Sequence, residues 1–211
     1  MERLHAHSRA EGVTLWTVMR RADTYDDLPA GADLDETKVL IDVSGLGVSG
    51  YAIDDWLNKE YRVSVGLSDA RHLLAIVAPG TTASDVRALA RGLAACAKGL
   101  RKGTLSLAPT GDAPPISALG VDMAIDPGEA LFGAAEQVPL AQAEGRIAAE
   151  MIAPAPPGVP RLVPGQRISA AHVQSLTANR DAGAFFLDPI DPSERTLRVV
   201  ADQPAQALAA E

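Results

Sequence analysis

The sequence predicts an α/β protein built in two parts. Three observations indicate this architecture. Residues 38–43 form a short, apolar, β-branched run of the kind that makes a buried strand. Apolar side chains between residues 82 and 102 recur at helical spacing. Residues 106–122 are rich in proline and glycine and have no periodicity, so they are interpreted as a linker between the two parts.

The segment before the first strand is predicted to be mostly helical. Residues 2–22 have helical spacing of apolar side chains, although Gly12 interrupts the pattern. The face that these side chains share would hold Val13, Trp16 and Met19. Residues 26–35 contain Pro29 and Gly31 and are predicted to form a turn.

The order β-α-β-β-α is predicted for the rest of the first part. The strand at 38–43 leads through a glycine-rich turn at 44–50 into a helix at 51–61. Two strands follow, at 62–67 and 73–77, separated by a short turn. The helix at 51–61 would bury Ile53, Trp56 and Leu57.

The helix that closes this order is the most regular element in the sequence. Thr82 and Asp85 have the spacing of a capping box, in which each side chain bonds the other residue's backbone. Gly99 and Gly103 mark the end of the helix. Its apolar positions are Val86, Leu89, Leu93, Ala97 and Leu100.

The second part is predicted to mix helices and short strands. An amphipathic helix is expected at 139–150, followed by a rigid proline-rich arm at 154–165. A second helix is expected at 169–179 with Ser169 as its cap, and strands at 185–187 and 196–200. The apolar face of the first helix would hold Leu140, Ala143, Ile147 and Met151. The Ala/Gln/Pro-rich tail that follows is expected to be frayed.

The composition bounds the function. The formal net charge of −8 argues against a nucleic-acid partner, because phosphates need a basic face. No apolar run reaches the roughly 20 residues that span a bilayer, and the polar N-terminus has no signal-peptide pattern. Cys96 is the single cysteine, which excludes an intrachain disulfide and fits a reducing compartment. A soluble, cytoplasmic protein is expected.

The sharpest local motif is Gly45-Leu46-Gly47-Val48-Ser49-Gly50. It fits the dinucleotide fingerprint, lies between a strand and a helix, and has Asp69 about 20 residues downstream. Such glycines let the backbone approach a pyrophosphate at the start of a helix. The alternative is a tight strand-to-helix turn that needs small residues for packing. We prefer this alternative, because no further parallel crossover follows to complete a dinucleotide-binding sheet.

Other candidate residues give weaker signals. Ser49 lacks the second glycine of a nucleophile elbow, because position 51 is tyrosine. The histidines are not at zinc-binding spacing with one another or with Cys96, which is interpreted as a small core residue. His72 could act as a general base but is more simply a strand-end histidine. The four histidines are His5, His7, His72 and His172. The carboxylates Asp54, Asp55 and Asp69 are interpreted as a solvated helix face and a turn.

Two stretches together resemble a known family. The first runs from Asp35 to Tyr51 and contains the strand and the glycine turn. The second joins Gly145-Arg146-Ile147 to the arm Pro156-Pro157-Gly158-Val159-Pro160. Both are similar to the C-terminal half of the bacterial ornithine/lysine/arginine decarboxylases, pyridoxal-phosphate enzymes with an aspartate-aminotransferase-like fold. The order and spacing agree from about Thr37 to Ile168.

The resemblance implies a specific division of the chain. Residues 1–105 would be the end of the aminotransferase-like region, with its small domain as the β-α-β-β-α unit. Residues 106–122 would be the linker, and residues 123–211 a smaller α+β domain, the family's C-terminal domain. In the family, the glycine turn belongs to the small domain and does not bind a dinucleotide.

The sequence departs from the family at the cofactor. The family holds pyridoxal phosphate on a lysine in a Ser-x-His-Lys motif, and none of Lys38, Lys59, Lys98 and Lys102 follows such a motif. Ala155 stands where many members have tyrosine, and Gly66 where many have glutamate. No catalytic, cofactor-binding or metal-binding residue is therefore carried over to this chain, and no cofactor is expected on the chain alone.

The resemblance implies a C-terminal fragment or split half of a basic amino-acid decarboxylase, a lyase of amino-acid and polyamine metabolism that is inactive alone. It would complete the active site and the subunit interface of a lysine-bearing cofactor-domain partner, or form a homo-oligomer, without nucleic acid or membrane. Two alternatives stay open. One is a non-catalytic remnant or protein-binding module. The other is a small nucleotide-binding protein that uses the turn from Gly45 to Gly50.

Overall fold

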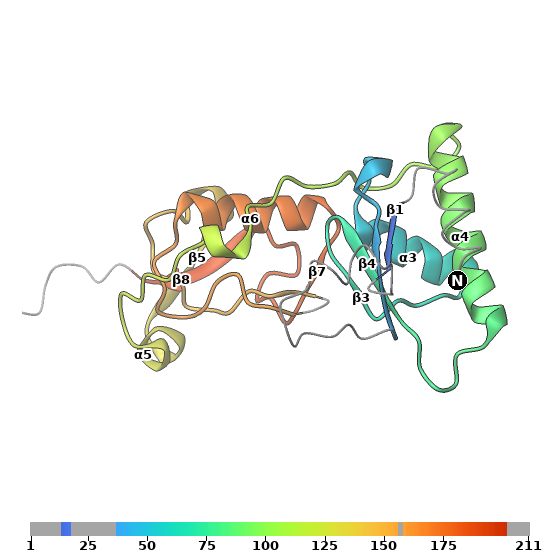
Figure 1. Ribbon diagram of the computed structural model, residues 1–211. Coiled ribbons are helices and arrows are strands. Elements are labelled where there is room, and N and C mark those ends of the chain that lie inside the picture. The colour runs from blue at the N-terminus through green and yellow to red at the C-terminus, as the bar shows by residue number, and fades with distance from the viewer. Residues whose placement is uncertain (1–13, 18–36, 156–157, 202–211) are drawn as a thin grey trace, which may run out of the picture. The chain divides into compact units, whose positions relative to one another are not determined.

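The computed structural model describes residues 14–17, 37–155 and 158–201, and these divide into two compact units (Figure 1). Unit 1 holds the described residues up to Gly111 together with Asp181–Ala184. Unit 2 holds Asp112–Arg180 and the described residues from Phe185 onward. The division after Gly111 falls inside the predicted linker. No helix among the described residues is long and apolar enough to cross a membrane.

Unit 1 is built on a four-stranded antiparallel sheet in the order β1-β2-β4-β3. The strands are β1 (Thr14–Thr17), β2 (Lys38–Asp42), β3 (Leu67–Ser68) and β4 (His72–Ile76). Ile41 in β2 lies opposite Leu73 in β4, and both side chains are fully buried. The predictions of strands at 38–43 and 73–77 are thus confirmed to within a residue at each end.

The prediction of a helix at 2–22 is wrong where the structure describes it, because Thr14–Thr17 is a strand. Its backbone pairs along its whole length with β2, from Thr14 opposite Asp42 to Thr17 opposite Val39. Threonine and tryptophan favour pleated, paired backbone, and this non-local pairing outweighs a helical spacing of apolar side chains. Val13, Met19, Gly12 and the turn predicted at 26–35 lie outside the described residues.

The helices α3 (Gly50–Tyr61) and α4 (Ala83–Arg101) pack on one face of this sheet. Thr82 and Asp85 form the predicted capping box at the start of α4, with both reciprocal hydrogen bonds present. Gly92 brings the helices close together, because a Cβ there would lie 2.5 Å from Leu57 Cδ2. The buried core of the unit holds Ile41, Val43, Val48, Ile53, Leu57, Leu73, Leu93, Cys96 and Ala97.

The strand predicted at 62–67 is mostly wrong, since regular pairing is limited to Leu67–Ser68. Arg62 adopts the left-handed conformation, with φ at 53°, and its N–H closes the last turn of α3. The Val63 N–H also turns back, to Leu57 O. Pairing with β4 starts only at Gly66, whose N–H donates to Leu74 O. Arg62 and Val63 therefore complete the end of α3, although the alternating pattern assigned them to a strand.

Unit 2 combines two small antiparallel pairs with two helices. Strand β5 (Ala135–Pro139) pairs with β8 (Thr196–Val200), and β6 (Pro154–Ala155) pairs with β7 (Phe185–Phe186). The helices are α5 (Pro127–Phe132) and α6 (Ala170–Asp181). The second predicted helix and both predicted strands are confirmed, whereas α5, capped by Asp126, was not predicted.

The amphipathic helix predicted at 139–150 is wrong. Pro139 ends β5, residues 140–142 make one 3-10 turn, and Gly145 has a φ of 81° that no helix allows. The backbone donors of this stretch bond to distant segments: Ala148 N–H to Gln166 O and Ala149 N–H to Arg198 O. Such non-local bonds replace the helical ladder, so the three-and-four spacing of the apolar residues was coincidental.

Candidate functional site

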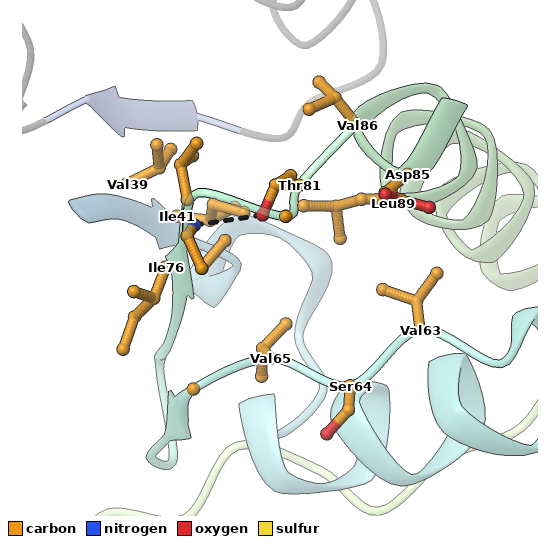
Figure 2. Close-up of a pocket in the computed structure, with 15 residues that line it drawn as sticks. Val39, Ile41, Val63, Ser64, Val65, Ile76, Thr81, Asp85, Val86 and Leu89 are labelled. Carbon is orange, nitrogen blue, oxygen red and sulfur yellow. Dashed lines mark hydrogen bonds between the residues drawn. The ribbon is translucent and has the colours of Figure 1, made fainter. Parts of the chain in front are cut away.

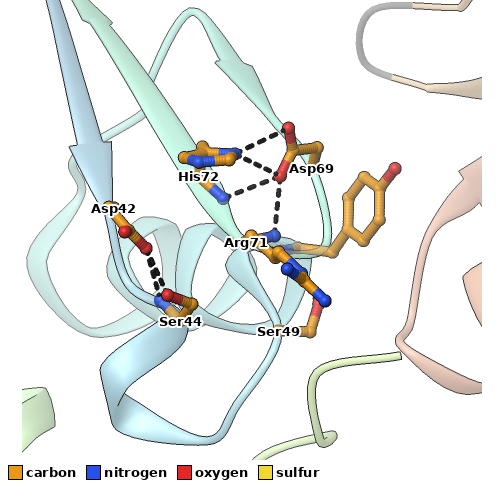
Figure 3. A network of polar contacts seen from close by, with 7 residues as sticks. Asp42, Ser44, Ser49, Asp69, Arg71 and His72 are labelled. Carbon is orange, nitrogen blue, oxygen red and sulfur yellow. Dashed lines mark hydrogen bonds and ion pairs between the residues drawn. The ribbon is translucent and has the colours of Figure 1, made fainter. Parts of the chain in front are cut away.

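The glycine motif forms a turn that packs against the β3–β4 hairpin (Figure 3). Position 47 requires glycine because φ is +70° there. Position 50 requires glycine for a different reason. A Cβ at Gly50 would lie 2.3 Å from Asp69 O and 2.6 Å from His72 O. The motif therefore serves close contact between α3 and a neighbouring backbone, as the packing interpretation of the sequence expected.

Three backbone donors at the start of α3, those of Ser49, Gly50 and Tyr51, already have acceptors within the chain. Ser49 N–H donates to Ala108 O at 2.8 Å, and Gly50 N–H donates to Ala70 O at 3.4 Å. Tyr51 N–H donates to the Ser49 hydroxyl, which is fully buried and acts as the helix cap. A phosphate at this helix would have to displace those bonds, so the geometry favours a structural turn over an anion site.

Asp69 does not reach toward the glycine turn as a ribose ligand would. Its Oδ1 accepts the N–H groups of Arg71 and His72 and so closes the β3–β4 turn (Figure 3). The His72 ring lies on the same carboxylate, with Nδ1 3.1 Å from Oδ2. This pair is partly exposed, and it lies beside Asp42, which is opposite His72 in the sheet. An Asp–His pair can position a proton acceptor, but this one is fully accounted for as a hairpin turn.

We expect no tight binding of a nicotinamide or flavin dinucleotide, because the helix donors are occupied and Asp69 holds the hairpin. Calorimetry with NAD and FAD should give no dissociation constant of about 1 μM or tighter, equivalent to about −8 kcal/mol. A micromolar constant that disappears in Gly47→Val would contradict this expectation and restore the nucleotide-binding alternative.

An apolar cavity of about 440 Å³ opens in unit 1 between the sheet, the segment after α3 and the first turns of α4 (Figure 2). Its walls include Val39 from β2, Val65, and Val86 and Leu89 from α4. Asp85 is the single charged residue among those that line it. Capping bonds with Thr82 hold the pKa of Asp85 below its usual value. The cavity can accept an apolar group, and its polar side chains are limited to Ser64, Thr81 and Asp85.

The remaining predicted candidates occupy ordinary structural places. Cys96 is buried in the core, and burial raises the pKa of its thiol to about 11. Asp55 pairs with Lys59 on the surface at 2.6 Å, as a solvated helix face would. Asp54 differs from that expectation, since it accepts a hydrogen bond from Ser68 and burial raises its pKa. His5 and His7 lie outside the described residues.

Unit 2 holds buried polar residues that the sequence reasoning missed. Glu150 is 4% exposed and accepts the backbone N–H groups of Ile190 and Arg198. The carboxylate thereby links the segment between β7 and β8 to strand β8 itself. Gln166 is also 4% exposed and contacts His172, which is 1% exposed. Sequence reasoning missed Glu150 because it placed this residue on the helix predicted at 139–150, where a glutamate is expected to be exposed to solvent.

Two further carboxyl groups before β8 have displaced pKa values. Hydrogen bonds from the hydroxyls of Ser193 and Thr196 hold the pKa of Asp191 far below its usual range. Burial, with a smaller contribution from Asp191, raises the pKa of Glu194 to about 7, while Arg180 opposes that rise. The Asp-Pro-Ser sequence is a typical turn signal and could have identified Asp191. Neither carboxyl lines the apolar cavity.

The comparisons with known proteins agree on one family. Residues 122–186 match the family described as Orn/Lys/Arg decarboxylase, C-terminal domain. An arginine decarboxylase of Halalkalibacterium halodurans is 34% identical over 174 residues, covering 82% of this chain and 35% of that protein. An arginine decarboxylase of Bacillus subtilis is 31% identical, with coverage of 83% and 35%. The chain thus spans about a third of the length of these relatives.

Solved structures give the same assignment at the level of the fold. The E. coli constitutive lysine decarboxylase matches with a TM-score of 0.57 and 17% identity, over 95% of this chain and 40% of that one. The Francisella novicida lysine decarboxylase matches with a TM-score of 0.59 and 17% identity, over 93% and 38%. Both similarities extend over nearly all of this chain, so they include both units.

Proposed function

This chain carries a C-terminal domain of the Orn/Lys/Arg decarboxylase family, and on that premise we propose that it is the C-terminal portion of a pyridoxal-phosphate-dependent basic amino-acid decarboxylase. Its role is to complete the active site and the subunit interface of a lysine-bearing cofactor domain. Alone it is inactive. The arginine decarboxylase relatives, similar across four fifths of this chain, carry the proposal.

The proposal includes a division of labour along the chain. Residues 1–105 contribute the aminotransferase-like small domain, residues 106–122 link, and residues 123–211 form the family's C-terminal domain. The protein works in the cytoplasm, in amino-acid and polyamine metabolism, within an oligomer. The sheet and two helices of unit 1 support a small-domain role, because they share one hydrophobic core. The stand-alone binding module remains the alternative.

The lysines of this chain do not fit pyridoxal phosphate. The cofactor supplies an electron sink for decarboxylation when a lysine holds it as a Schiff base inside a pocket. All four lysines are exposed, and none lines the apolar cavity. Lys59 is paired with Asp55, and Lys98 and Lys102 lie at the end of α4. In the proposed function, the lysine that holds the cofactor therefore lies outside these residues.

We expect the purified chain to show no specific pyridoxal phosphate attachment. Borohydride reduction at sub-stoichiometric cofactor, followed by peptide mass spectrometry, should find no single lysine carrying a pyridoxyl group. Scattered labelling at excess cofactor is the control for weak reaction with exposed lysines. One dominant modified lysine at low cofactor would overturn the inactive-alone part of the proposal and leave the family assignment intact.

Exposed apolar side chains in unit 2 support the proposed interface. They gather on what we call the β6–β7 surface, made of Met151, Val159, Phe185, Leu187 and Ile190, which are 48%, 41%, 68%, 39% and 50% exposed. The β6–β7 pairing and the Leu187 N–H bond to Ala153 O bring their segments together. Clustered apolar exposure of this kind marks association sites. One member of the surface, Val159, belongs to the proline-rich arm predicted from the sequence.

A further inference from the structure

Arg161, in the proline-rich arm of unit 2, has a buried guanidinium donor without an acceptor. Its Nε is shielded from water and makes no hydrogen bond. Among the residues that the structure describes, none pairs with the rest of this guanidinium either. The residue as a whole is partly exposed. A buried polar group without a partner is costly, so its presence in a folded protein calls for an explanation.

The other partly buried arginines in the described part of unit 2 have acceptors inside the unit. Arg146 pairs with Glu136 at 2.6 Å, and Arg198 Nη1 donates to two backbone carbonyls at 2.9 Å. Arg180 Nη1 donates to one backbone carbonyl at 3.4 Å. These side chains hold the unit together by their hydrogen bonds, and Arg161 differs from them in this respect.

The hydroxyl of Ser175 is the second buried side-chain group without a partner among the described residues, and it has a simpler explanation. It lies on α6, where a serine hydroxyl can rotate toward a carbonyl of the preceding turn. The Nε–H of an arginine has no such freedom, because it lies in the plane of the guanidinium and points in one direction. Arg161 therefore needs an acceptor that comes to it.

The carboxylates near the β6–β7 surface do not supply this acceptor. Both oxygens of Glu150 accept backbone N–H groups, and the oxygens of Asp191 accept two hydroxyls and further N–H groups. Asp188 is exposed to water, so its charge is solvated without a partner. The positive charge of Arg161 is thus left unpaired beside an apolar surface.

Arg161 lies in the segments that make the β6–β7 surface. Val159, two residues before it, is a member of that surface. The Arg161 N–H donates to Ile152 O at 2.8 Å, and Ile152 follows the surface residue Met151. Exposed apolar side chains and an unpaired guanidinium therefore occur together. Protein interfaces use this combination, with apolar contacts for burial and an arginine fork for a carboxylate.

Resting on the proposed function, we propose that the β6–β7 surface binds a part of the lysine-bearing cofactor domain that presents an aspartate or glutamate among apolar side chains, and that Arg161 pairs with this carboxylate. A carboxylate matches the planar guanidinium with two parallel hydrogen bonds and so satisfies its donors when water leaves the interface. Because the chain has a net charge of −8, the pair also fixes where an acidic group can dock.

Arg161→Met tests the pairing while keeping a long apolar side chain. In the isolated chain, thermal unfolding followed by circular dichroism should show unchanged or higher stability, because a buried donor without an acceptor is removed. Affinity for the lysine-bearing portion of an arginine decarboxylase relative should fall about thirtyfold or more, mainly through faster dissociation. Arg91→Met removes the same charge from an exposed position on α4 and is the control, which should bind normally.

Carbodiimide coupling identifies the chemistry of the partner group. Arg161→Lys places an amine at this position and keeps the charge. In the complex, coupling should join this amine through an amide bond to an aspartate or glutamate of the lysine-bearing portion, which peptide mass spectrometry locates. Coupling to a carboxylate of this same chain instead would show that the positive charge is satisfied internally and would refute the pairing.

The remaining outcomes separate this pairing from the proposed function. If Arg161→Met binds the lysine-bearing portion like the unmutated chain, the pairing is refuted and the proposed function stands. Inorganic phosphate that shifts the Arg161 Nε–H resonance of the isolated chain at submillimolar concentration would indicate a small-anion site and would overturn the pairing too. If the unmutated chain does not bind the lysine-bearing portion, the proposed function and the pairing fail together.

Discussion

Replacing Gly50 with valine is expected to destabilise unit 1 strongly. The new Cβ would lie 2.3 Å and 2.6 Å from two carbonyl oxygens, Asp69 O and His72 O, and backbone atoms cannot swing aside as a side chain would. Either α3 or the β3–β4 hairpin has to move, which exposes the core around Ile53 and Leu73. A loss of about 3–5 kcal/mol is expected, at the upper end for overpacking and strain.

Tryptophan fluorescence during denaturant unfolding measures this loss selectively. Trp16 and Trp56 are the only tryptophans, and both belong to unit 1. Gly80→Val is the matched control, because a Cβ at Gly80 meets nothing within 4 Å. The control should change the free energy of unfolding by about 0.5 kcal/mol or less. A similar small change in Gly50→Val would show that the glycine motif is not retained for packing and would reopen a ligand role.

The glycine motif also shows what sequence alone can and cannot decide. The capping box of Thr82 and Asp85 was predictable because both partners are three residues apart and the bonds are local. The reason for Gly50 was not, since the atoms that exclude a side chain belong to a hairpin about 20 residues away. The motif by itself therefore fits both a pyrophosphate loop and a packed turn, and the packed turn was preferred only because no further parallel crossover follows it.

Unit 2 was harder to predict for a related reason. Residues 139–150 have a helical spacing of apolar side chains, yet their N–H groups bond to Gln166, Ile168 and Arg198. The spacing of apolar residues can indicate which side chains face the core. It does not indicate which acceptors the backbone N–H groups bond to. The buried chain of Gln166 and His172 was missed as well, because a glutamine and a lone histidine resemble surface residues until α6 and the arm are in place.

The final prediction concerns association. The chain alone is expected to form oligomers or aggregates, and co-expression with the lysine-bearing portion of an arginine decarboxylase relative is expected to give a soluble complex. A partner that binds only the folded form stabilises it by mass action. Light scattering measures the first result. Copurification and release of CO₂ from arginine, lysine or ornithine measure the second, with the lysine-bearing portion alone as the blank.

Phe185→Asp makes the test specific to the β6–β7 surface. The side chain is 68% exposed on β7, so a charge there should leave folding intact while placing a desolvated carboxylate in the proposed interface. Loss of about 2–4 kcal/mol of binding, thirtyfold or more in affinity, is expected for a central apolar contact. Ile116→Asp, 48% exposed but in another part of unit 2, is the control and should bind normally.

A monodisperse monomer with a cooperative, high thermal transition, unaffected by either change and without affinity for the lysine-bearing portion, would contradict the split-enzyme role. It would favour an independent binding module, because the β6–β7 surface would then be stable in contact with water and would need no decarboxylase partner.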